Sequence, residues 1–100
     1  LAHVLEYNRP AAADLYAEIA PLIFPGLEAH DNEMRVTGLV EELKALGPSL
    51  GMTARLSELG ISHNNLPMLA EDAMKQERLL VNNPREMTYE AALAIYEAAL

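Results

Sequence analysis

The amino-acid sequence predicts an all-α protein, because three observations agree. Apolar residues recur at intervals of three and four along most of the chain, the spacing that places side chains on one face of a helix. Hydrophobic residues make up 51 % of the 100 residues, yet only 5 % are aromatic, so small side chains favour close helix packing. No segment alternates apolar and polar residues as a half-buried strand does. A chain of this length forms one domain, or a piece of one, around a single core.

Two helices are predicted in the first 21 residues. The first has an apolar face made of Leu1, Val4 and Leu5. The motif Asn8-Arg9-Pro10 should end it, because a proline breaks a helix interior. The second has an apolar stripe made of Ala12, Leu15, Tyr16 and Ile19. It should end near Pro21, and residues 22–26 then form an apolar turn that is too short and too proline-bounded for a strand.

A third helix is predicted to begin at Asp31 or Asn32, since either side chain can accept a hydrogen bond from the first turn. Its apolar stripe consists of Val36, Leu39, Val40, Leu43 and Leu46. The pair Gly47-Pro48 is predicted to stop it. The stretch from Ser49 to Asn65 reads as irregular, with one short turn of helix at Arg55–Leu59 before Gly60.

Two further helices complete the prediction. Asn64 or Asn65 should cap the fourth, and Pro67 fits its first turn, where a missing N–H costs nothing. The apolar stripe of this helix is Leu66, Leu69, Ala70 and Ala73. The Asn83-Pro84 step then disfavours helix, Thr88 can cap the last helix, and Glu90 lies in its positive first turn. The stripe of the last helix is Ala92, Ile95, Tyr96, Ala99 and Leu100.

Composition excludes several classes of protein. A net charge of −8 with scattered basic residues argues against binding to nucleic acid, which needs clustered lysine and arginine. There is no cysteine, which excludes disulfides and thiolate metal sites and is compatible with a cytoplasmic location. No apolar run approaches the ~20 residues of a membrane span, so no membrane association is expected. The chain starts without the charged region of a signal peptide, and both ends look like helices cut open.

The residues that carry chemistry do not assemble into a recognisable site. No two of the histidines, His3, His30 and His63, are four residues apart, so no helix face presents a paired metal site. His30 precedes Asp31 and Glu33, but capping and the helix dipole explain these acids better than metal binding does. Nucleotide-phosphate loops and a serine nucleophile elbow are absent from the sequence. Taken alone, the residues indicate a helical bundle with no complete active site, and no residue is assigned a catalytic, cofactor-binding or metal-binding role.

Three segments nevertheless resemble a known family in the right order. The first eight residues, Leu1-Ala2-His3-Val4-Leu5-Glu6-Tyr7-Asn8, are similar to its L-P-H-V-x-x-[YF]-N segment, with Ala2 where proline is usual. The second set is Leu46-Gly47, Leu56–Ile61, Leu66-Pro67 and Leu69-Ala70. The third is Asn83-Pro84-Arg85, Thr88 and Ile95-Tyr96. Together they span nearly the whole chain, which therefore resembles a fragment of the C-terminal helical domain of the iron-containing (group III) alcohol dehydrogenases.

This resemblance implies a parent enzyme with an N-terminal α/β domain that binds NAD or NADP. A divalent metal, iron or sometimes zinc, sits between the two domains on one Asp and three His ligands. The resemblance places all four ligands upstream of Leu1 and makes His3 a non-ligand. Residues 1–100 are then a partial C-terminal domain that lacks the nucleotide-binding domain and the metal-ligand segment. This fragment alone is expected to bind no cofactor or metal and to be inactive.

The resemblance also implies a reaction. In the parent, the metal acts as a Lewis acid on the substrate oxygen while hydride passes between a small alcohol and the nicotinamide, giving an aldehyde or ketone. By the same resemblance, the loop before Asn83 is expected to approach the substrate pocket, which makes Leu80, Val81 and Asn82 candidates for shaping it. Pro84 and Arg85 are interpreted as a turn and a structural hydrogen-bond donor.

Two alternatives stay open at the level of sequence. One is a maleylacetate reductase or a glycerol dehydrogenase relative, although the Asn-Pro-Arg tail favours the ordinary alcohol dehydrogenases. The other is a non-catalytic, acidic helical interaction module that melts cooperatively as a monomer. A severed domain should instead expose the apolar face of Leu1, Val4 and Leu5 and associate. The substrate, the metal, the choice of NAD or NADP and a homo-oligomeric state are not determined.

Overall fold

The computed structural model describes residues 1–53 and 55–100, and within them it contains helices and no strand. The α-helices are α1 (Ala2–Ile23), α2 (Asn32–Ser49), α3 (Leu66–Met74), α4 (Glu77–Leu80) and α5 (Tyr89–Ala98). Short 3₁₀ turns occur at Pro25–Leu27, Leu56–Leu59 and His63–Asn65. The predicted all-α class is confirmed. In this part of the chain no helix has both the length and the apolar character needed to cross a membrane.

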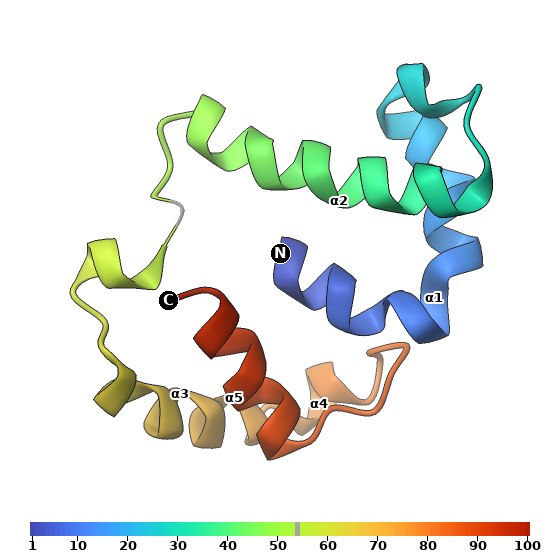
Figure 1. Cartoon of the computed structure of the whole chain (residues 1–100). Helices are drawn as coiled ribbons and strands as arrows, with labels where there is room; N and C mark the ends of the chain where they lie inside the picture. Colours follow the sequence, from blue (N-terminus) through green and yellow to red (C-terminus); the bar gives the residue numbers. More distant parts are fainter. Residues whose placement is uncertain (54) are drawn as a thin grey trace.

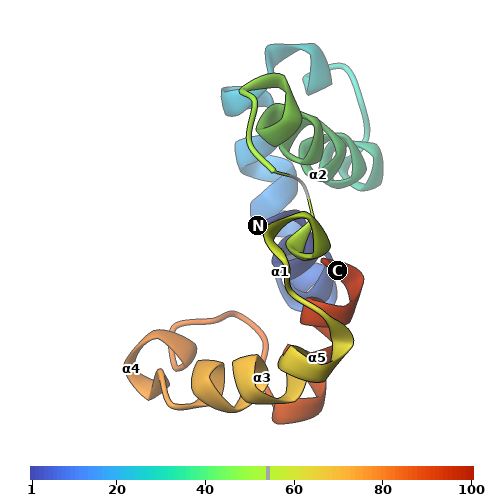
Figure 2. The same ribbon diagram turned by 90° about the vertical axis from the view of Figure 1, so that its left-hand side faces the viewer.

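The helices form two packed pairs that share a contact. α1 lies along α2, α3 lies against α5, and α1 also touches α5 (Figure 1). In Figure 2 the first pair occupies the upper part of the molecule, with α3 and α4 at the bottom. The molecule measures 43 × 31 × 18 Å and has a radius of gyration of 14.8 Å. A compact domain of this length has a radius of about 13 Å, so the fold is open and its core is small.

Alanine dominates that core. The buried apolar side chains in the described part of the chain are Ala12, Ala17, Ala20, Val36, Leu39, Val40, Leu66, Ala70 and Ala92. The largest fully buried ones are Leu39, Leu66 and Val36. Each of these three stabilises the fold by about 1.5–3 kcal/mol relative to an exposed position. The alanines contribute less area but let helix backbones approach each other closely.

The first two predicted helices are in fact one. α1 continues through Pro10 and Pro21 to Ile23, and Figure 1 shows its axis bending part-way along. A proline in a helix interior removes one hydrogen bond and costs roughly 3 kcal/mol, which usually produces a kink or a break. Contacts with distant segments hold the helix here. Asn8 bonds to Asn83, and Arg9 Nη2 donates to Thr37 Oγ1 at 2.7 Å.

The apolar stripe predicted for the second half of α1 faces solvent rather than the core, so this prediction is wrong. Leu15 and Ile19 are 62 % and 42 % exposed, Tyr16 is half-buried, and the buried positions are Ala12, Ala17 and Ala20. The buried face of α1 carries small residues because α1 packs closely along α2. Four large apolar side chains are left on the outside. We call Leu15, Ile19, Leu22 and Ile23 the α1 apolar stripe.

α2 begins as predicted and ends later than predicted. Asp31 Oδ1 accepts from the Met34 N–H at 2.9 Å. Pro48 lies inside the helix, where its fixed φ suits the helical backbone although its nitrogen cannot donate a hydrogen bond to the carbonyl four residues back. Gly51 is the true stop, at a φ of 74°. The Met52 N–H donates to the Gly47 carbonyl at 3.0 Å, the bond that marks a Schellman motif.

The inner face of α2 follows the predicted stripe for three of its five members. Val36, Leu39 and Val40 are buried, Leu43 is half-buried, and Leu46 is 44 % exposed. Leu27, in the turn after α1, fits against this helix at Gly38. A Cβ atom there would lie 2.5 Å from Leu27 Cδ2, so the glycine lets the turn seat closely.

The segment before α3 differs from its prediction in one detail. A 3₁₀ turn at Leu56–Leu59 before Gly60 is confirmed, with Gly60 at a φ of 81°. The Asn65 side chain does not cap α3. Its Oδ1 accepts from both the N–H and the hydroxyl of Ser62 at 2.9 Å, which closes a preceding 3₁₀ turn instead. α3 continues directly from that turn, with Pro67 in its first turn as predicted.

The end of the chain folds largely as predicted. α4 is one short turn of helix that the sequence did not predict, since four residues are too few to show a periodic pattern. Thr88 Oγ1 accepts from the Ala91 N–H at 3.2 Å and caps α5, with Glu90 in the first turn. Ala92 is buried, and the other members of the predicted α5 stripe are half-buried.

Candidate functional site

Two segments far apart in sequence meet where α1 begins. The side chains of Asn8 and Asn83 form a reciprocal pair, each Nδ2 donating to the other Oδ1 at 2.8 Å. Asn8 is only 3 % exposed and is the one buried polar residue of the described chain. A buried amide costs free energy unless it is hydrogen-bonded, and here each amide satisfies the other. This pair joins the two terminal motif segments.

Tyr7 and Arg85 extend the same contact. The Arg85 guanidinium carbon lies 4.2 Å from the centroid of the Tyr7 ring, within the range of a cation–π interaction. Arg85 Nη1 donates to the Tyr7 carbonyl at 2.8 Å, and the Tyr7 hydroxyl donates to the Glu86 carbonyl. The prediction of Arg85 as a structural hydrogen-bond donor is confirmed. We call Tyr7, Asn8, Asn83 and Arg85 the clamp.

The predicted pocket residues lie immediately before the clamp. Leu80 is half-buried at the end of α4, Val81 is 78 % exposed, and Asn82 is exposed with its Nδ2 donating to the Arg78 carbonyl at 3.0 Å. The structure brings them next to Asn83 but places them in neither of the two hollows described for this chain. Their role in a substrate pocket therefore stays a prediction.

A hollow of about 410 Å³ lies where the start of α1, the end of α2 and the end of α5 meet. Apolar side chains form most of its wall, and His3, Lys44 and Arg55 are its basic members, with no acidic residue among those that line it. Burial, then Lys44, then the amino terminus lower the pKa of His3 below its ordinary value of 6.5. The imidazole is therefore neutral at neutral pH. Sequence reasoning missed this grouping, because the three basic residues share no spacing.

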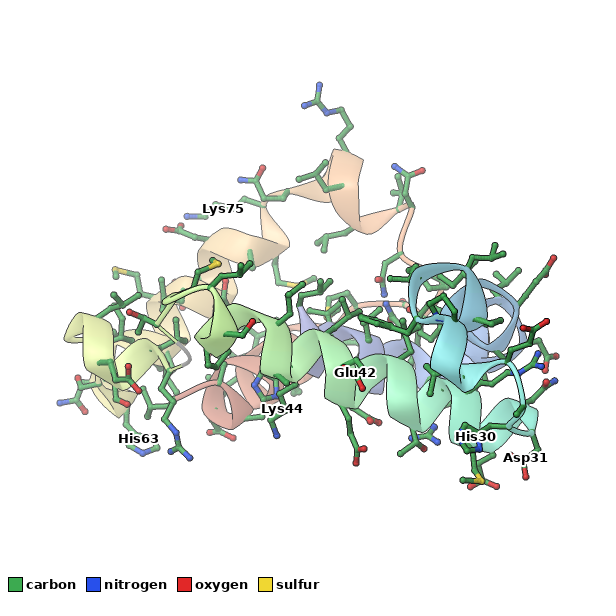
Figure 3. All side chains as sticks on the ribbon, turned by 90° about the horizontal axis from the view of Figure 1, so that it is seen from above. His30, Asp31, Glu42, Lys44, His63 and Lys75 are labelled. Carbon is green, nitrogen blue, oxygen red and sulfur yellow. The ribbon has the colours of Figure 1, made fainter. Side chains whose placement is uncertain are left out.

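The described residues offer no fit for a catalytic metal. They contain no group of three or more His, Cys, Asp or Glu side chains placed to hold an ion. Figure 3 shows His30 and Asp31 at one end of the molecule and His63 at the other. The interpretation of Asp31 as a helix cap is confirmed, because its Oδ1 accepts from the Met34 N–H. The described residues therefore do not provide the group of ligands that an iron or zinc ion needs.

Comparison with known proteins identifies the family. The model of the Fe-containing alcohol dehydrogenase family, C-terminal, matches residues 1–100. The chain belongs to this family. The resemblance found in the sequence is thus confirmed, and it covers the helical C-terminal part of the family.

Two curated relatives agree with this family membership. The chain is 29 % identical over 99 residues to lactaldehyde reductase of Escherichia coli (strain K12), which is 99 % of this chain and 26 % of that protein. It is 38 % identical over 60 residues to long-chain-alcohol dehydrogenase 1 of Geobacillus thermodenitrificans (strain NG80-2), which is 60 % of this chain and 15 % of that protein. Both relatives are oxidoreductases by name. The chain spans about a quarter of the length of lactaldehyde reductase.

Proposed function

We propose that this chain is the C-terminal helical part of a metal-dependent alcohol dehydrogenase that uses NAD or NADP to interconvert a small alcohol and its aldehyde or ketone. The observation that carries the proposal is the family match over all 100 residues. The names of the two relatives support an alcohol or an aldehyde as the substrate class.

In this proposal the chemistry is divided between this chain and the rest of the enzyme. The iron or zinc ion is held by residues outside the hundred, because the donor set described here does not fit a metal. The nucleotide is held by the N-terminal domain that the family resemblance implies. This chain supplies the outer wall of the cleft. Within that wall the clamp fixes the segment Leu80–Asn82, which we propose lies against the substrate.

Two proteins assayed side by side test the proposal: the full-length enzyme and the hundred-residue chain. Formation of NADH or NADPH is followed by absorbance with a panel of small alcohols, and bound metal is measured by elemental analysis. We expect metal and turnover only in the full-length enzyme. Robust turnover by the hundred residues alone would refute the proposal that the metal and the nucleotide are bound by the rest of the enzyme.

The same panel separates the alternatives within the superfamily. Including maleylacetate and glycerol among the substrates, with both cofactors, distinguishes a maleylacetate reductase or a glycerol dehydrogenase from an ordinary alcohol dehydrogenase. A full-length protein that binds metal but turns over none of these substrates would count against the proposed reaction.

A further inference from the structure

The two packed helix pairs each bury apolar side chains of their own. In the α1–α2 pair, the buried apolar residues are Ala12, Ala17, Ala20, Val36, Leu39 and Val40. In the α3–α5 pair, where α3 lies against α5, they are Leu66, Ala70 and Ala92. Figure 2 shows the α1–α2 pair above α3 and α4, so the first pair does not enclose the second.

The join between the two pairs is largely polar. Among the described residues, every hydrogen bond that connects residues 1–53 with residues 55–100 involves the clamp. The Asn8 and Asn83 side chains exchange two such bonds, Arg85 Nη1 donates to the Tyr7 carbonyl, and the Tyr7 hydroxyl donates to the Glu86 carbonyl. α1 also touches α5, but this contact is smaller than the contact inside either pair. Directional polar bonds therefore carry a large part of the join.

A small polar join favours motion of the two pairs relative to each other. Between parts of one chain such motion is expected, unless the interface is large and hydrophobic. When the clamp opens, water can bond to the freed amides and carbonyls, so each hydrogen bond stabilises the closed state only by its small net contribution. The apolar contacts inside each pair gain nothing from opening, and they keep each pair intact.

The closed clamp nevertheless specifies a single arrangement. Asn83 Nδ2 donates to Asn8 Oδ1 and to the Arg85 carbonyl, and Asn83 Oδ1 accepts from Asn8 Nδ2. Asn8 is only 3 % exposed, so water does not replace these bonds while the clamp is closed. Hydrogen bonds weaken steeply with misalignment, and a buried amide without a partner is costly. Partly displaced positions are therefore less stable than either the closed or the fully open state.

We propose that the clamp is a latch between two bodies. When it is closed, it holds the α1–α2 pair and the α3–α5 pair in the arrangement of Figure 2. When it is open, the α3–α5 pair turns as a body relative to the α1–α2 pair. Asn8 and Asn83 form the buried part of the latch, and Arg85 stacked on Tyr7 forms its exposed part. The proposal does not depend on the proposed function, because its test measures distances and not turnover.

Distances between two spin labels on the hundred-residue chain test the latch. The chain has no cysteine, so two introduced cysteines are labelled uniquely. Glu42→Cys on α2 with Glu71→Cys on α3 measures the distance across the join, and Glu42→Cys with Glu18→Cys on α1 measures the distance inside the first pair. All three glutamates are exposed. The labelled chain is diluted with unlabelled chain, so that distances between copies do not contribute.

Without further substitution we expect one main distance across the join and a second, minor distance from open molecules. Asn83→Ala removes both hydrogen bonds to Asn8 and leaves a buried amide unpaired, so the ratio of open to closed molecules should rise about tenfold. The distance inside the first pair should not change. The matched control is Asn82→Ala, because that side chain bonds to the Arg78 carbonyl, outside the clamp.

A second variant decides the case in which Asn83→Ala does not fold. Arg85→Met removes the stacking on Tyr7 and the bond to its carbonyl, and it should raise the open fraction in the same direction, with Arg78→Met as its control. Distances across the join that are equal in a clamp variant and in its control would overturn the latch. Equal broadening across the join and inside the first pair would also overturn it, because the whole fold would then have loosened.

Discussion

At the scale of single residues, Asn8 lies where helical periodicity expects an apolar side chain. Only the partner at Asn83, 75 positions along the chain, makes its burial tolerable. A buried amide without a partner costs about 1–3 kcal/mol, so burial of either asparagine is expected only where the other can pair with it. The residues next to each asparagine in sequence do not reveal that partner. Caps are the opposite case. Asp31 and Thr88 bond to backbone only three residues away, and their roles were therefore predictable from sequence.

The hydrogen bond from the Ala91 N–H to Thr88 Oγ1 is a local cap that a single substitution can test. Replacing it in Thr88→Ala removes the acceptor for the Ala91 N–H and should lower the free energy of unfolding by about 1 kcal/mol. Urea denaturation of the hundred-residue chain would measure the loss. Thr88→Ser keeps the hydroxyl and serves as the control. Equal stability of the alanine and wild-type chains would contradict the cap.

His3 makes a prediction about pH. Its pKa is lowered by burial first and by the positive charge of Lys44 second. Above its ordinary value of 6.5 the imidazole is neutral whether the chain is folded or unfolded, and it does not affect stability. Below that value the unfolded chain binds the proton first, so stability should fall as pH decreases through 6.5 toward the folded pKa.

An NMR titration of the His3 ring protons measures this pKa in the folded chain. Lys44→Met removes one cause of the shift and should move the pKa upward, while His3→Gln should flatten the fall of stability in acid. A His3 pKa at or above 6.5 would show that the hollow does not desolvate the imidazole.

At the scale of elements, the errors in the prediction concern prolines and glycines. Pro10 was predicted to end a helix, but α1 continues through it because contacts with distant segments offset the cost of the proline. At the end of α2 the sequence offered two glycines. The helix was predicted to stop at Gly47, because a proline follows it. Gly51 has the positive φ that actually ends the helix.

These two glycines predict substitutions of opposite sign. Gly51→Ala forces a side chain into a left-handed conformation and should destabilise the chain by about 1 kcal/mol. Gly47→Ala lies in a helix, where alanine is favoured over glycine, but the ring of Pro48 crowds a Cβ atom on the preceding residue, so the gain should be below about 0.5 kcal/mol. Thermal melts of the two variants measure the difference. Shifts of the same sign would contradict the assignment of Gly51 as the stop.

At the scale of the whole molecule, the most prominent feature is apolar surface. The predicted exposed face was Leu1, Val4 and Leu5, yet Val4 and Leu5 are half-buried and only Leu1, 80 % exposed, lies open. The larger exposed surface is the α1 apolar stripe instead. Contiguous apolar patches of this kind promote association in water.

We therefore expect the hundred-residue chain to self-associate through the α1 apolar stripe. The double variant Leu15→Ser with Leu22→Ser should shift the chain toward monomer in sedimentation experiments, with little change in the free energy of unfolding, because both side chains are exposed. Glu18→Gln, on the same helix, is the control. A wild-type chain that remains monomeric at high concentration would contradict the expectation and favour the independent module.

The sequence by itself determined the all-α class, the caps of α2 and α5 and the family, because each depends on spacing within a few residues or on motifs in a fixed order. Only the tertiary structure decided which face of α1 is buried, that α1 is one helix, and that Asn8 pairs with Asn83. The tertiary structure alone also showed that His3, Lys44 and Arg55 gather around one hollow. The physical reason is common to all of these. They arise from packing between segments distant in sequence, and such packing leaves no periodic pattern in either segment alone.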